Sequence, residues 1–213
     1  MIPATHDSAL ARIKAETLIE SLSWLRQFHS RIVVIKFGGN AMVDEALQTA
    51  FAQDMAYLRF VGIKPVVVHG GGPQITARLA ELGIQSDFRA GFRYTDYETI
   101  EVVRDVLRNQ IGASLAGEIE QYGARAKVLS GEDENLFKAQ VKKAQGDEGE
   151  IDLGLVGEVS SVNPGVVLRA LDAGIVPVVS TVAPTVDGQL LNVNADLAAS
   201  SLAVALGAEK LMV

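Results

Sequence analysis

The chain has 213 residues, of which 48% are hydrophobic and 21% are charged, and this apolar content is typical of a buried parallel sheet covered on both faces. Its formal net charge is −7 and its lysines and arginines are scattered, which argues against a nucleic-acid or anionic-membrane partner, since those need a concentrated basic patch. The absence of cysteine excludes disulfides, thiol catalysis and cysteine-ligated metals.

The first thirty residues predict an amphipathic helix that precedes the first strand. Apolar side chains recur along one helical stripe, namely Leu10, Ile13, Leu18, Leu22 and Leu25. This stripe either packs on its own domain or forms an arm that covers another subunit. There is no signal-peptide core and no run approaching the roughly 20 apolar residues that span a bilayer, so we expect a cytoplasmic protein without a membrane partner.

Apolar runs alternate with helical patterns through the rest of the chain. The predicted strands occupy residues 31–36, 65–69, 125–129, 153–159, 175–179 and 209–213. The predicted helices between them occupy residues 44–61, 73–83, 96–122, 163–174 and 195–206. This alternation predicts an α/β fold, a three-layer doubly wound sandwich with a mainly parallel sheet.

Three segments depart from the alternation. Residues 136–152 predict a hairpin strand followed by an acidic, glycine-containing loop. Residues 181–193 place an Asp-Gly pair between alternating apolar residues, which indicates a second hairpin. The sequence stops at Val213 inside a predicted strand, from which we expect a longer parent protein.

The first predicted strand leads into a pair of glycines in the sequence RIVVIKFGGN, residues 31–40. A buried strand has little use for a lysine, so we expect Lys36 at the exit of this strand. Gly38 and Gly39 leave backbone N–H groups uncovered, and another molecule can approach them closely. Taken alone, the segment is compatible with an ordinary turn or with a binding site.

The second predicted strand ends in three glycines, Gly70 to Gly72, and a helix follows at Pro73. Exposed glycine N–H groups beside a helix N-terminus favour an anion site, although a tight structural turn is the alternative. The spacing fits neither common nucleotide-binding motif, since position 75 is Ile75 and no Gly-Lys pair occurs. His69 is either a structural residue or a ligand. We expect both glycine loops at the same edge of the sheet.

Two polar segments are further candidates for a binding site. Arg89 and Arg93 lie among aromatic residues, where a guanidinium either grips a carboxylate or is simply solvated. Asn192, Asn194 and Asp196 precede a helix of small residues. They are either ordinary helix caps or groups that contact a substrate and orient a lysine.

Six motifs occur in a characteristic order along the chain. They are VVIKFGGNAM, VVVHGGGPQI, AGFRYTD, GLVGEV, GIVPVVS and LLNVNAD. In this order they resemble the amino-acid kinase family, most closely its branch that acts on N-acetyl-L-glutamate, over nearly all of residues 31–213. Family members are considerably longer, and the part absent here resembles the bulk of their nucleotide-binding lobe.

The resemblance implies ATP-dependent phosphorylation of the side-chain carboxylate of N-acetyl-L-glutamate, a step toward arginine, with Mg²⁺ carried by the nucleotide. It also implies three segments: an N-terminal helical arm in residues 1–30, an acetylglutamate-binding lobe in 31–180 and the start of a nucleotide-binding lobe in 181–213. Because most of that last lobe is absent, we expect this segment alone to be inactive.

Residue roles follow from the same resemblance. Lys36 resembles the lysine that balances charge on the transferring phosphoryl group. Asp196 resembles the carboxylate that organises this lysine. The second lysine that this carboxylate organises in the family has no counterpart before Val213. The backbone N–H groups of Gly38 and Gly39 would hold phosphate oxygens.

On the substrate side, the N–H groups of Gly71 and Gly72 would hold the reacting carboxylate and the arriving phosphoryl group. Arg93 and Asn192 match the residues that grip the other carboxylate and the amide region. A carboxylate is already ionised at neutral pH, so its phosphorylation needs alignment and charge neutralisation rather than a general base.

The N-terminal helix resembles the extension of arginine-inhibited, hexameric family members, although Trp24 stands where they commonly have tyrosine. We therefore expect a homo-oligomer, a dimer or a hexamer, with arginine as a candidate feedback inhibitor. Two alternatives remain open. One is a kinase of the same fold that acts on aspartate, glutamate or uridylate, and the other is a non-catalytic module that senses acetylglutamate or arginine.

Overall fold

The computed structural model describes residues 8–146 and 149–213. Residues 1–7 of the predicted arm and residues 147–148 of the predicted acidic loop lie outside the described residues. In the described part, no helix combines the length and the apolar character needed to cross a membrane.

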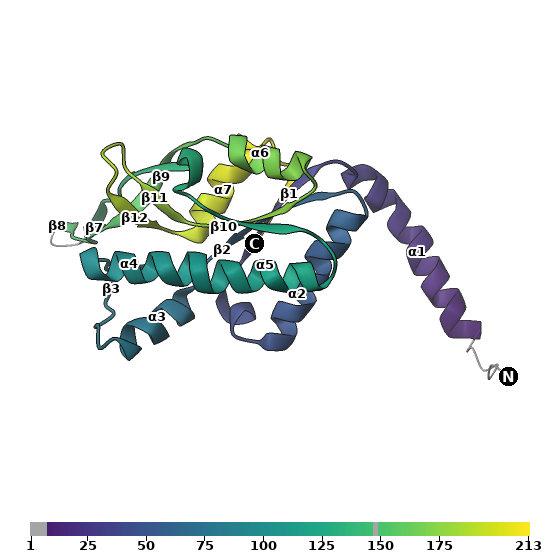
Figure 1. Cartoon of the computed structure of the whole chain (residues 1–213), viewed down its shortest axis with the longest axis horizontal. Coiled ribbons are helices and arrows are strands. Elements are labelled where there is room, and N and C mark those ends of the chain that lie inside the picture. The colour runs from purple at the N-terminus through teal and green to yellow at the C-terminus, as the bar shows by residue number, and fades with distance from the viewer. Residues whose placement is uncertain (1–7, 147–148) are drawn as a thin grey trace.

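A five-stranded parallel sheet forms the centre of the molecule (Figure 1). Its strands, in spatial order, are β13 (Lys210–Met212), β1 (Ile32–Phe37), β2 (Lys64–His69), β10 (Val176–Ser180) and β5 (Ala126–Ser130). The valine-rich inner strands are buried almost throughout, as expected for a sheet covered on both faces. β1 and β2 pair in register up to Phe37 opposite His69, so the glycine loops that follow them leave the sheet side by side.

Alternate residues of these strands point into two separate hydrophobic cores, which makes the fold a three-layer sandwich. Val33 and Ile35 of β1 lie in the first core, and Val34 lies in the second. The helices on the first face are α2 (Glu45–Phe60), α3 (Gly72–Glu81), α4 (Tyr97–Asp105) and α5 (Ala113–Gln121). Those on the second face are α6 (Gly165–Asp172) and α7 (Ala195–Ala205) (Figure 1). The predicted α/β fold with a mainly parallel sheet is confirmed.

The strand predicted at residues 153–159 does not join the central sheet. It forms β9 (Val156–Val162) in a second, four-stranded sheet with the order β11 (Val182–Pro184), β12 (Leu190–Val193), β9, β6 (Phe137–Val141). There β9 pairs parallel with β12 and antiparallel with β6, because a strand's apolar content does not determine its partner. The hairpin predicted at residues 181–193 is confirmed by the antiparallel pairing of β11 with β12.

The helix predicted at residues 96–122 is continuous, but its middle is wound more widely. α4 passes into a π-helical segment, Val106–Gly112, which passes into α5. Wider turns redirect side chains and are frequent near functional sites. This segment places Leu107 and Ile111 against Gly71, where an added Cβ would lie 2.8 Å and 2.4 Å from their methyl carbons.

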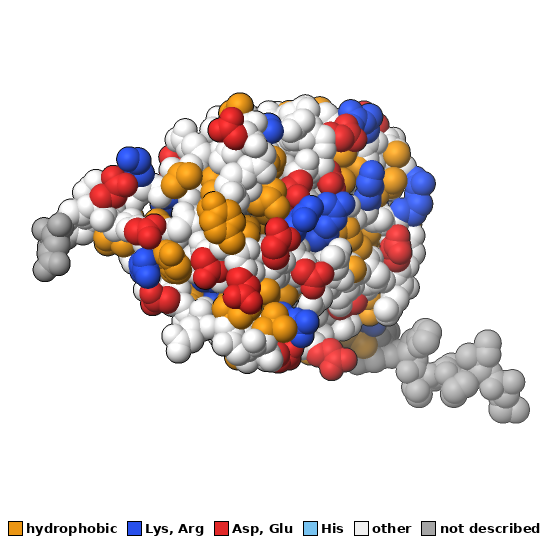
Figure 2. Space-filling view, turned by 60° about the vertical axis from the view of Figure 1, so that its left-hand side comes forward, with side chains coloured by type: hydrophobic (Ala, Val, Ile, Leu, Met, Phe, Trp, Pro, Cys, Tyr) orange, Lys and Arg blue, Asp and Glu red, His pale blue; other side chains and the backbone are white. Residues whose placement is uncertain are grey.

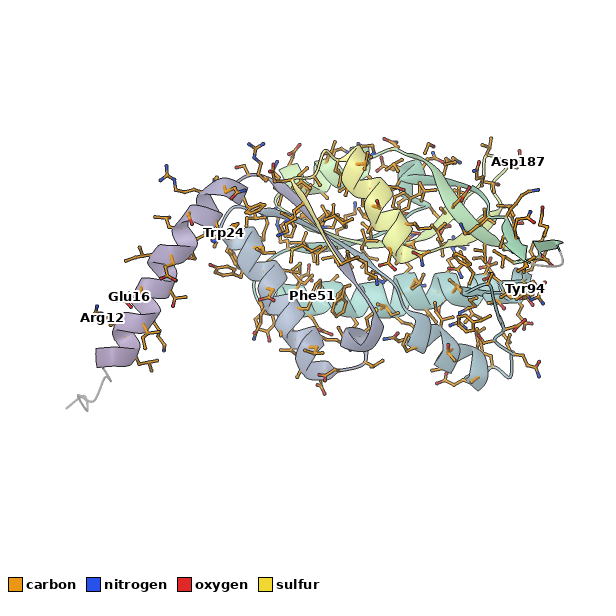
Figure 3. The ribbon with its side chains drawn as sticks, turned by 180° about the vertical axis from the view of Figure 1, so that it is seen from behind. Arg12, Glu16, Trp24, Phe51, Tyr94 and Asp187 are labelled. Atoms are coloured by element: carbon orange, nitrogen blue, oxygen red, sulfur yellow. The ribbon has the colours of Figure 1, made fainter. Side chains whose placement is uncertain are left out.

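Helix α1 (Ser8–Phe28) extends away from the body of the protein (Figure 1). Its apolar stripe includes Leu10, 49% exposed, Ile13, 58%, Leu18, 67%, and Leu22, 53%. The stripe therefore does not pack on the described part of this chain, contrary to one of the two alternatives. Only the end of α1 is anchored, where Phe28 reaches the first core and stacks with Trp24, whose position Figure 3 labels.

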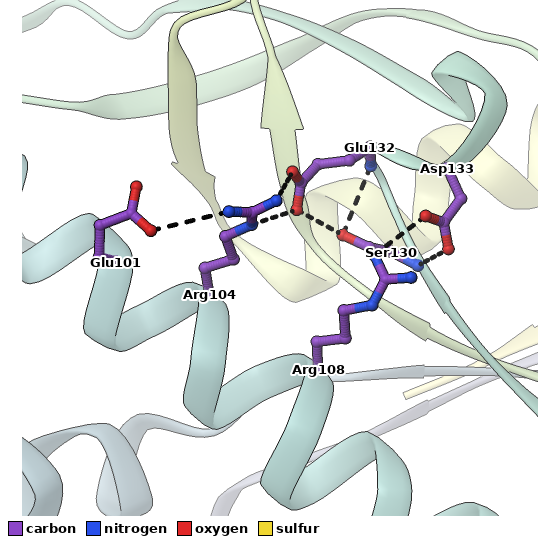
Figure 4. Close-up of polar contacts among 6 residues, drawn as sticks. All are labelled: Glu101, Arg104, Arg108, Ser130, Glu132 and Asp133. Atoms are coloured by element: carbon purple, nitrogen blue, oxygen red, sulfur yellow. Dashed lines mark hydrogen bonds and ion pairs between the residues drawn. The ribbon is translucent and has the colours of Figure 1, made fainter.

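The surface carries acidic and basic side chains intermixed with apolar ones (Figure 2). One ionic network fastens α4 and the π-helical segment to the turn after β5 (Figure 4). Arg104 Nη2 lies 2.9 Å from Glu132 Oε1, and Arg108 Nη1 lies 2.9 Å from Asp133 Oδ1. Asp133 Oδ2 also accepts a hydrogen bond from the backbone N–H of Ser130 at 3.0 Å, so the network holds the exit of β5 in place.

Candidate active site

A cavity of about 500 Å³ opens where β1 and β2 end. Its lining includes all eight residues for which a site role is predicted, namely Lys36, Gly38, Gly39, Gly71, Gly72, Arg93, Asn192 and Asp196. Parallel strands deliver their following loops to one edge of the sheet, which brings residues together that are far apart in the sequence.

The first loop pairs a lysine with a carboxylate from the far end of the chain. Lys36 Nζ lies 3.0 Å from Oδ1 of Asp196 in the first turn of α7, and the lysine side chain is 21% exposed. A Cβ on Gly38 would lie 2.9 Å from both Cε and Nζ of Lys36, so glycine lets the lysine lie across the loop. Gly39 has φ of +66°, in the left-handed region that favours glycine.

The second loop presents a helix N-terminus to the cavity. Helix α3 begins at Gly72 with Pro73 in its first turn, and nothing lies within 4 Å of a Cβ placed on Gly72. The backbone N–H of Gly70 donates to Phe37 O at 3.1 Å, which ties this loop to the first one. Open backbone at the positive end of a helix dipole is suited to an anion.

His69 is completely buried next to the second loop. Its Nδ1 lies 3.0 Å from Gly70 O, and its Nε2 has no hydrogen-bond partner among the described residues. Burial lowers the pKa of His69 to about 4, although the contact with Gly70 opposes this shift. The imidazole is therefore neutral at neutral pH, and it does not line the cavity. Of the two alternatives, these facts favour the structural one.

Arg93 is a buried cation that has no counter-ion among the described residues. It ends the short hairpin of β3 (Phe88–Arg89) and β4 (Phe92–Arg93) and is 7% exposed. Its Nη2 donates to Gly72 O at 3.0 Å and to Thr76 Oγ1 at 2.8 Å. Burial lowers the pKa of Arg93, and no carboxylate of the described residues lies within ion-pair distance of it. A buried charge is costly unless paired, so an anionic ligand would stabilise this side chain.

Arg89 fits neither alternative, because groups of the protein outside the cavity hold its guanidinium. Its Nε lies 3.0 Å from Asp87 Oδ2, and its guanidinium lies 3.8 Å from the ring centroid of Tyr94, which Figure 3 labels. It does not line the cavity. Its contacts stabilise the hairpin instead.

Asn192 and Asn194 both line the cavity, but they differ in their hydrogen-bond partners. Asn194 is the N-cap of α7, and its Oδ1 accepts hydrogen bonds from the N–H groups of Asp196 and Leu197 at 2.9 Å and 3.1 Å. Asn192, on β12, faces the cavity, and its Nδ2 donates to Thr95 Oγ1 at 3.2 Å. The cap thus leaves the Asp196 carboxylate available to Lys36.

The sequence of residues 31–213 matches the amino acid kinase family. The chain belongs to this family. It is 56% identical to the acetylglutamate kinase of Saccharopolyspora erythraea over 99% of this chain and 70% of the relative. It is 57% identical to the acetylglutamate kinase of a Nocardioides species over 94% of this chain and 64% of the relative.

Solved structures share the kinase-family fold. The structure of smu.665 from Streptococcus mutans is 28% identical with a TM-score of 0.74, and the match covers 84% of this chain and 70% of that one. N-acetylglutamate synthase from Neisseria gonorrhoeae, complexed with coenzyme A and N-acetyl-glutamate, is 23% identical with a TM-score of 0.73. That match covers 92% of this chain and 44% of the synthase, and at this identity it shows the fold alone.

Three residues at this kinase-family site are not predicted from the sequence. Leu107 and Ile111 confine Gly71, and Thr95 contacts Asn192. In the sequence, Leu107 and Ile111 are typical of ordinary core residues of a helix. Only the π-helical turns direct their side chains toward the loop that contains Gly71. The one available signal for Thr95 is its place two residues after Arg93 in the motif AGFRYTD.

Replacing the N-cap of α7 tests how this part of the kinase-family site is held. We expect Asn194→Ala to lower the free energy of unfolding by about 0.5–2 kcal/mol, because two backbone N–H groups lose their acceptor. Urea denaturation measures the change. Asn194→Ser keeps a capping oxygen and should recover most of the loss. Equal stability of the alanine, serine and unchanged proteins would contradict the assignment.

Proposed function

We propose that this chain supplies the substrate-binding part of an enzyme that phosphorylates the side-chain carboxylate of N-acetyl-L-glutamate with ATP, a step in arginine biosynthesis. The observation that carries this proposal is the buried guanidinium of Arg93, which pairs with no carboxylate of the described residues and lies in the same cavity as the Lys36–Asp196 pair. The α-carboxylate of the substrate would supply the missing anion, which leaves its side-chain carboxylate free to reach the glycine loops. The acetylglutamate kinases at 56% and 57% identity support the choice of substrate.

The cavity suits a reaction that needs alignment more than proton transfer. An ionised carboxylate can attack the γ-phosphorus directly, so the protein has to hold both reactants in line and neutralise charge. In our proposal, Gly71 and Gly72 hold the reacting groups through backbone N–H donors, and Arg93 and Asn192 hold the rest of the substrate. Preorganised donors of this kind typically contribute several kcal/mol of transition-state stabilisation.

On the phosphate side, we assign Gly38 and Gly39 to the phosphate oxygens of ATP and Lys36 to the charge that develops on the phosphoryl group. Asp196 would hold the lysine in place through its 3.0 Å contact. Among the described residues, no group of three or more His, Asp or Glu side chains is placed to hold a metal ion. In our proposal Mg²⁺ arrives bound to ATP, where it neutralises phosphate charge.

The proposal extends to the organisation of the protein. Residues 31–180 would form the acetylglutamate-binding lobe, residues 181–213 would begin the nucleotide-binding lobe, and residues 1–30 would form an arm in a dimer or hexamer. The exposed apolar stripe of α1 supports the arm, and a monomeric mass by light scattering would contradict it. Arginine as a feedback inhibitor is part of the same proposal, and its binding can be titrated in parallel.

A calorimetric titration of N-acetyl-L-glutamate into the chain tests the substrate assignment. We expect saturable binding, with L-glutamate, L-aspartate and uridylate binding at least about tenfold more weakly, because they lack the acetamido group or the matching carboxylates. Preference for one of these three would favour another kinase of the fold. Absence of N-acetyl-L-glutamate binding by a folded sample would contradict the proposal.

A further inference from the structure

Thr95 contacts both residues to which we assign the α-carboxylate and the amide of the substrate, Arg93 and Asn192. It is completely buried, with 0% of its surface exposed. Its Oγ1 donates to Arg93 O at 2.9 Å and accepts from Asn192 Nδ2 at 3.2 Å. One hydroxyl therefore connects the β3–β4 hairpin to β12, although Thr95 and Asn192 are 97 positions apart in the sequence.

The single proton of this hydroxyl determines how the Asn192 amide is oriented. A backbone carbonyl can only accept a hydrogen bond, so the Thr95 proton is committed to Arg93 O. Toward Asn192 the hydroxyl can then only accept, which requires the NH₂ end of the amide on that side. The Oδ1 end is left without a hydrogen bond from the described residues, on a side chain that lines the cavity.

The backbone of Thr95 is held as firmly as its side chain. Its N–H donates to Leu153 O at 3.3 Å, and its carbonyl accepts from Leu155 N at 2.6 Å. A Cβ on Gly154 would lie 2.3 Å from Thr95 O, so this close approach requires glycine at position 154. Thr95 is thus a fixed point against which the amide of Asn192 is aligned.

We infer that Thr95 is a positioning residue that presents Asn192 Oδ1 to the cavity as an acceptor for the amide N–H of the substrate. The inference rests on the proposed function, because it assumes an N-acylated amino acid as ligand. According to this inference, Thr95 makes the site bind an amide ligand more tightly than the corresponding ester, which has an oxygen in place of the N–H group.

Comparing N-acetyl-L-glutamate with its ester analogue 2-acetoxyglutarate tests this role by calorimetry. We expect the unchanged chain to bind the amide about tenfold more tightly than the ester, since the ester cannot donate to Asn192 Oδ1. Thr95→Val removes the hydroxyl, so the side-chain amide of Asn192 can flip and present its NH₂ group to the ligand. The amide-to-ester affinity ratio should therefore fall to about threefold or less. Thr95→Ser keeps the hydroxyl and should keep the ratio.

A control variant separates positioning from stability. Thr99→Val removes another buried hydroxyl, on α4 outside the cavity, and should leave the amide-to-ester ratio unchanged even where the protein is less stable. If Thr95→Val does not fold, Thr95→Cys replaces it, because a thiol accepts hydrogen bonds only weakly and should lower the ratio in part.

The outcomes distinguish the inference from the function on which it rests. A ratio that is unchanged in Thr95→Val or Thr95→Cys, or lost in Thr95→Ser, overturns the role of Thr95 alone, while binding of N-acetyl-L-glutamate itself persists. Failure of the unchanged, folded chain to bind N-acetyl-L-glutamate contradicts the proposed function, and the inference falls with it.

Discussion

Arg93→Ala is expected to weaken the binding of N-acetyl-L-glutamate by about 100-fold or more, measured by calorimetric titration. A guanidinium has five N–H donors, and three of these are committed to Ser86, Gly72 and Thr76, which leaves two for a ligand. The substitution removes both the only cation assigned to the α-carboxylate and the donors that hold Gly72 O in place. The loss should therefore exceed that of an exposed ion pair.

Arg89 offers a matched control for this prediction. It lies on the same hairpin, but its contacts are with Asp87, Tyr94 and the backbone carbonyl of Asp152, and it does not line the cavity. Arg89→Ala should change the affinity by no more than about threefold. If both variants lost affinity equally, the effect would reflect disturbance of the hairpin, and Arg93 would not be the carboxylate-binding residue.

Gly71→Ala should be the most destabilising single-methyl change at the cavity. The new Cβ would lie 2.4 Å from Ile111 Cδ1 and 2.8 Å from Leu107 Cδ2, inside a packed core. The φ of Gly71, 176°, is extended backbone that any residue adopts, so the cost is steric rather than conformational. We expect the free energy of unfolding to fall by about 1–3 kcal/mol, as measured by urea denaturation.

Two further variants decide whether that loss comes from the contact. Gly72→Ala introduces the same methyl group where nothing lies within 4 Å, so stability should be nearly unchanged. Its methyl group faces the cavity and should reduce ligand binding instead. Ile111→Val in the Gly71→Ala background should recover part of the stability by removing the nearest methyl carbon. Equal stability of Gly71→Ala and the unchanged chain would contradict the contact.

The sequence predicts the local features of the site correctly because they depend on few neighbouring residues. The parallel strands that lead into glycine loops follow from apolar runs that end in glycine, and the start of α3 follows from Pro73. The same local logic finds the hairpin at residues 181–193 from its Asp-Gly pair.

Other features depend on which segments meet in space. Residue types alone leave Arg89 and Arg93 equivalent. The family resemblance selects Arg93, and the packing of the hairpin on α3 buries it in the cavity. Residue types also leave Asn192 and Asn194 equivalent as caps or ligands; the resemblance selects Asn192, and the pairing of β12 with β9 directs it toward Thr95.

The sequence by itself determined the fold class and the two glycine loops. Both follow from strand and helix periodicity or from the backbone freedom of glycine, which act within a few residues. The eight candidate site residues were selected by the resemblance of the six ordered motifs to the kinase family, and all eight line the cavity. Tertiary structure alone decided the second sheet, the π-helical turns against Gly71 and the contact of Thr95 with Asn192. These depend on strand pairing and on burial between distant segments, and local sequence preferences do not determine either.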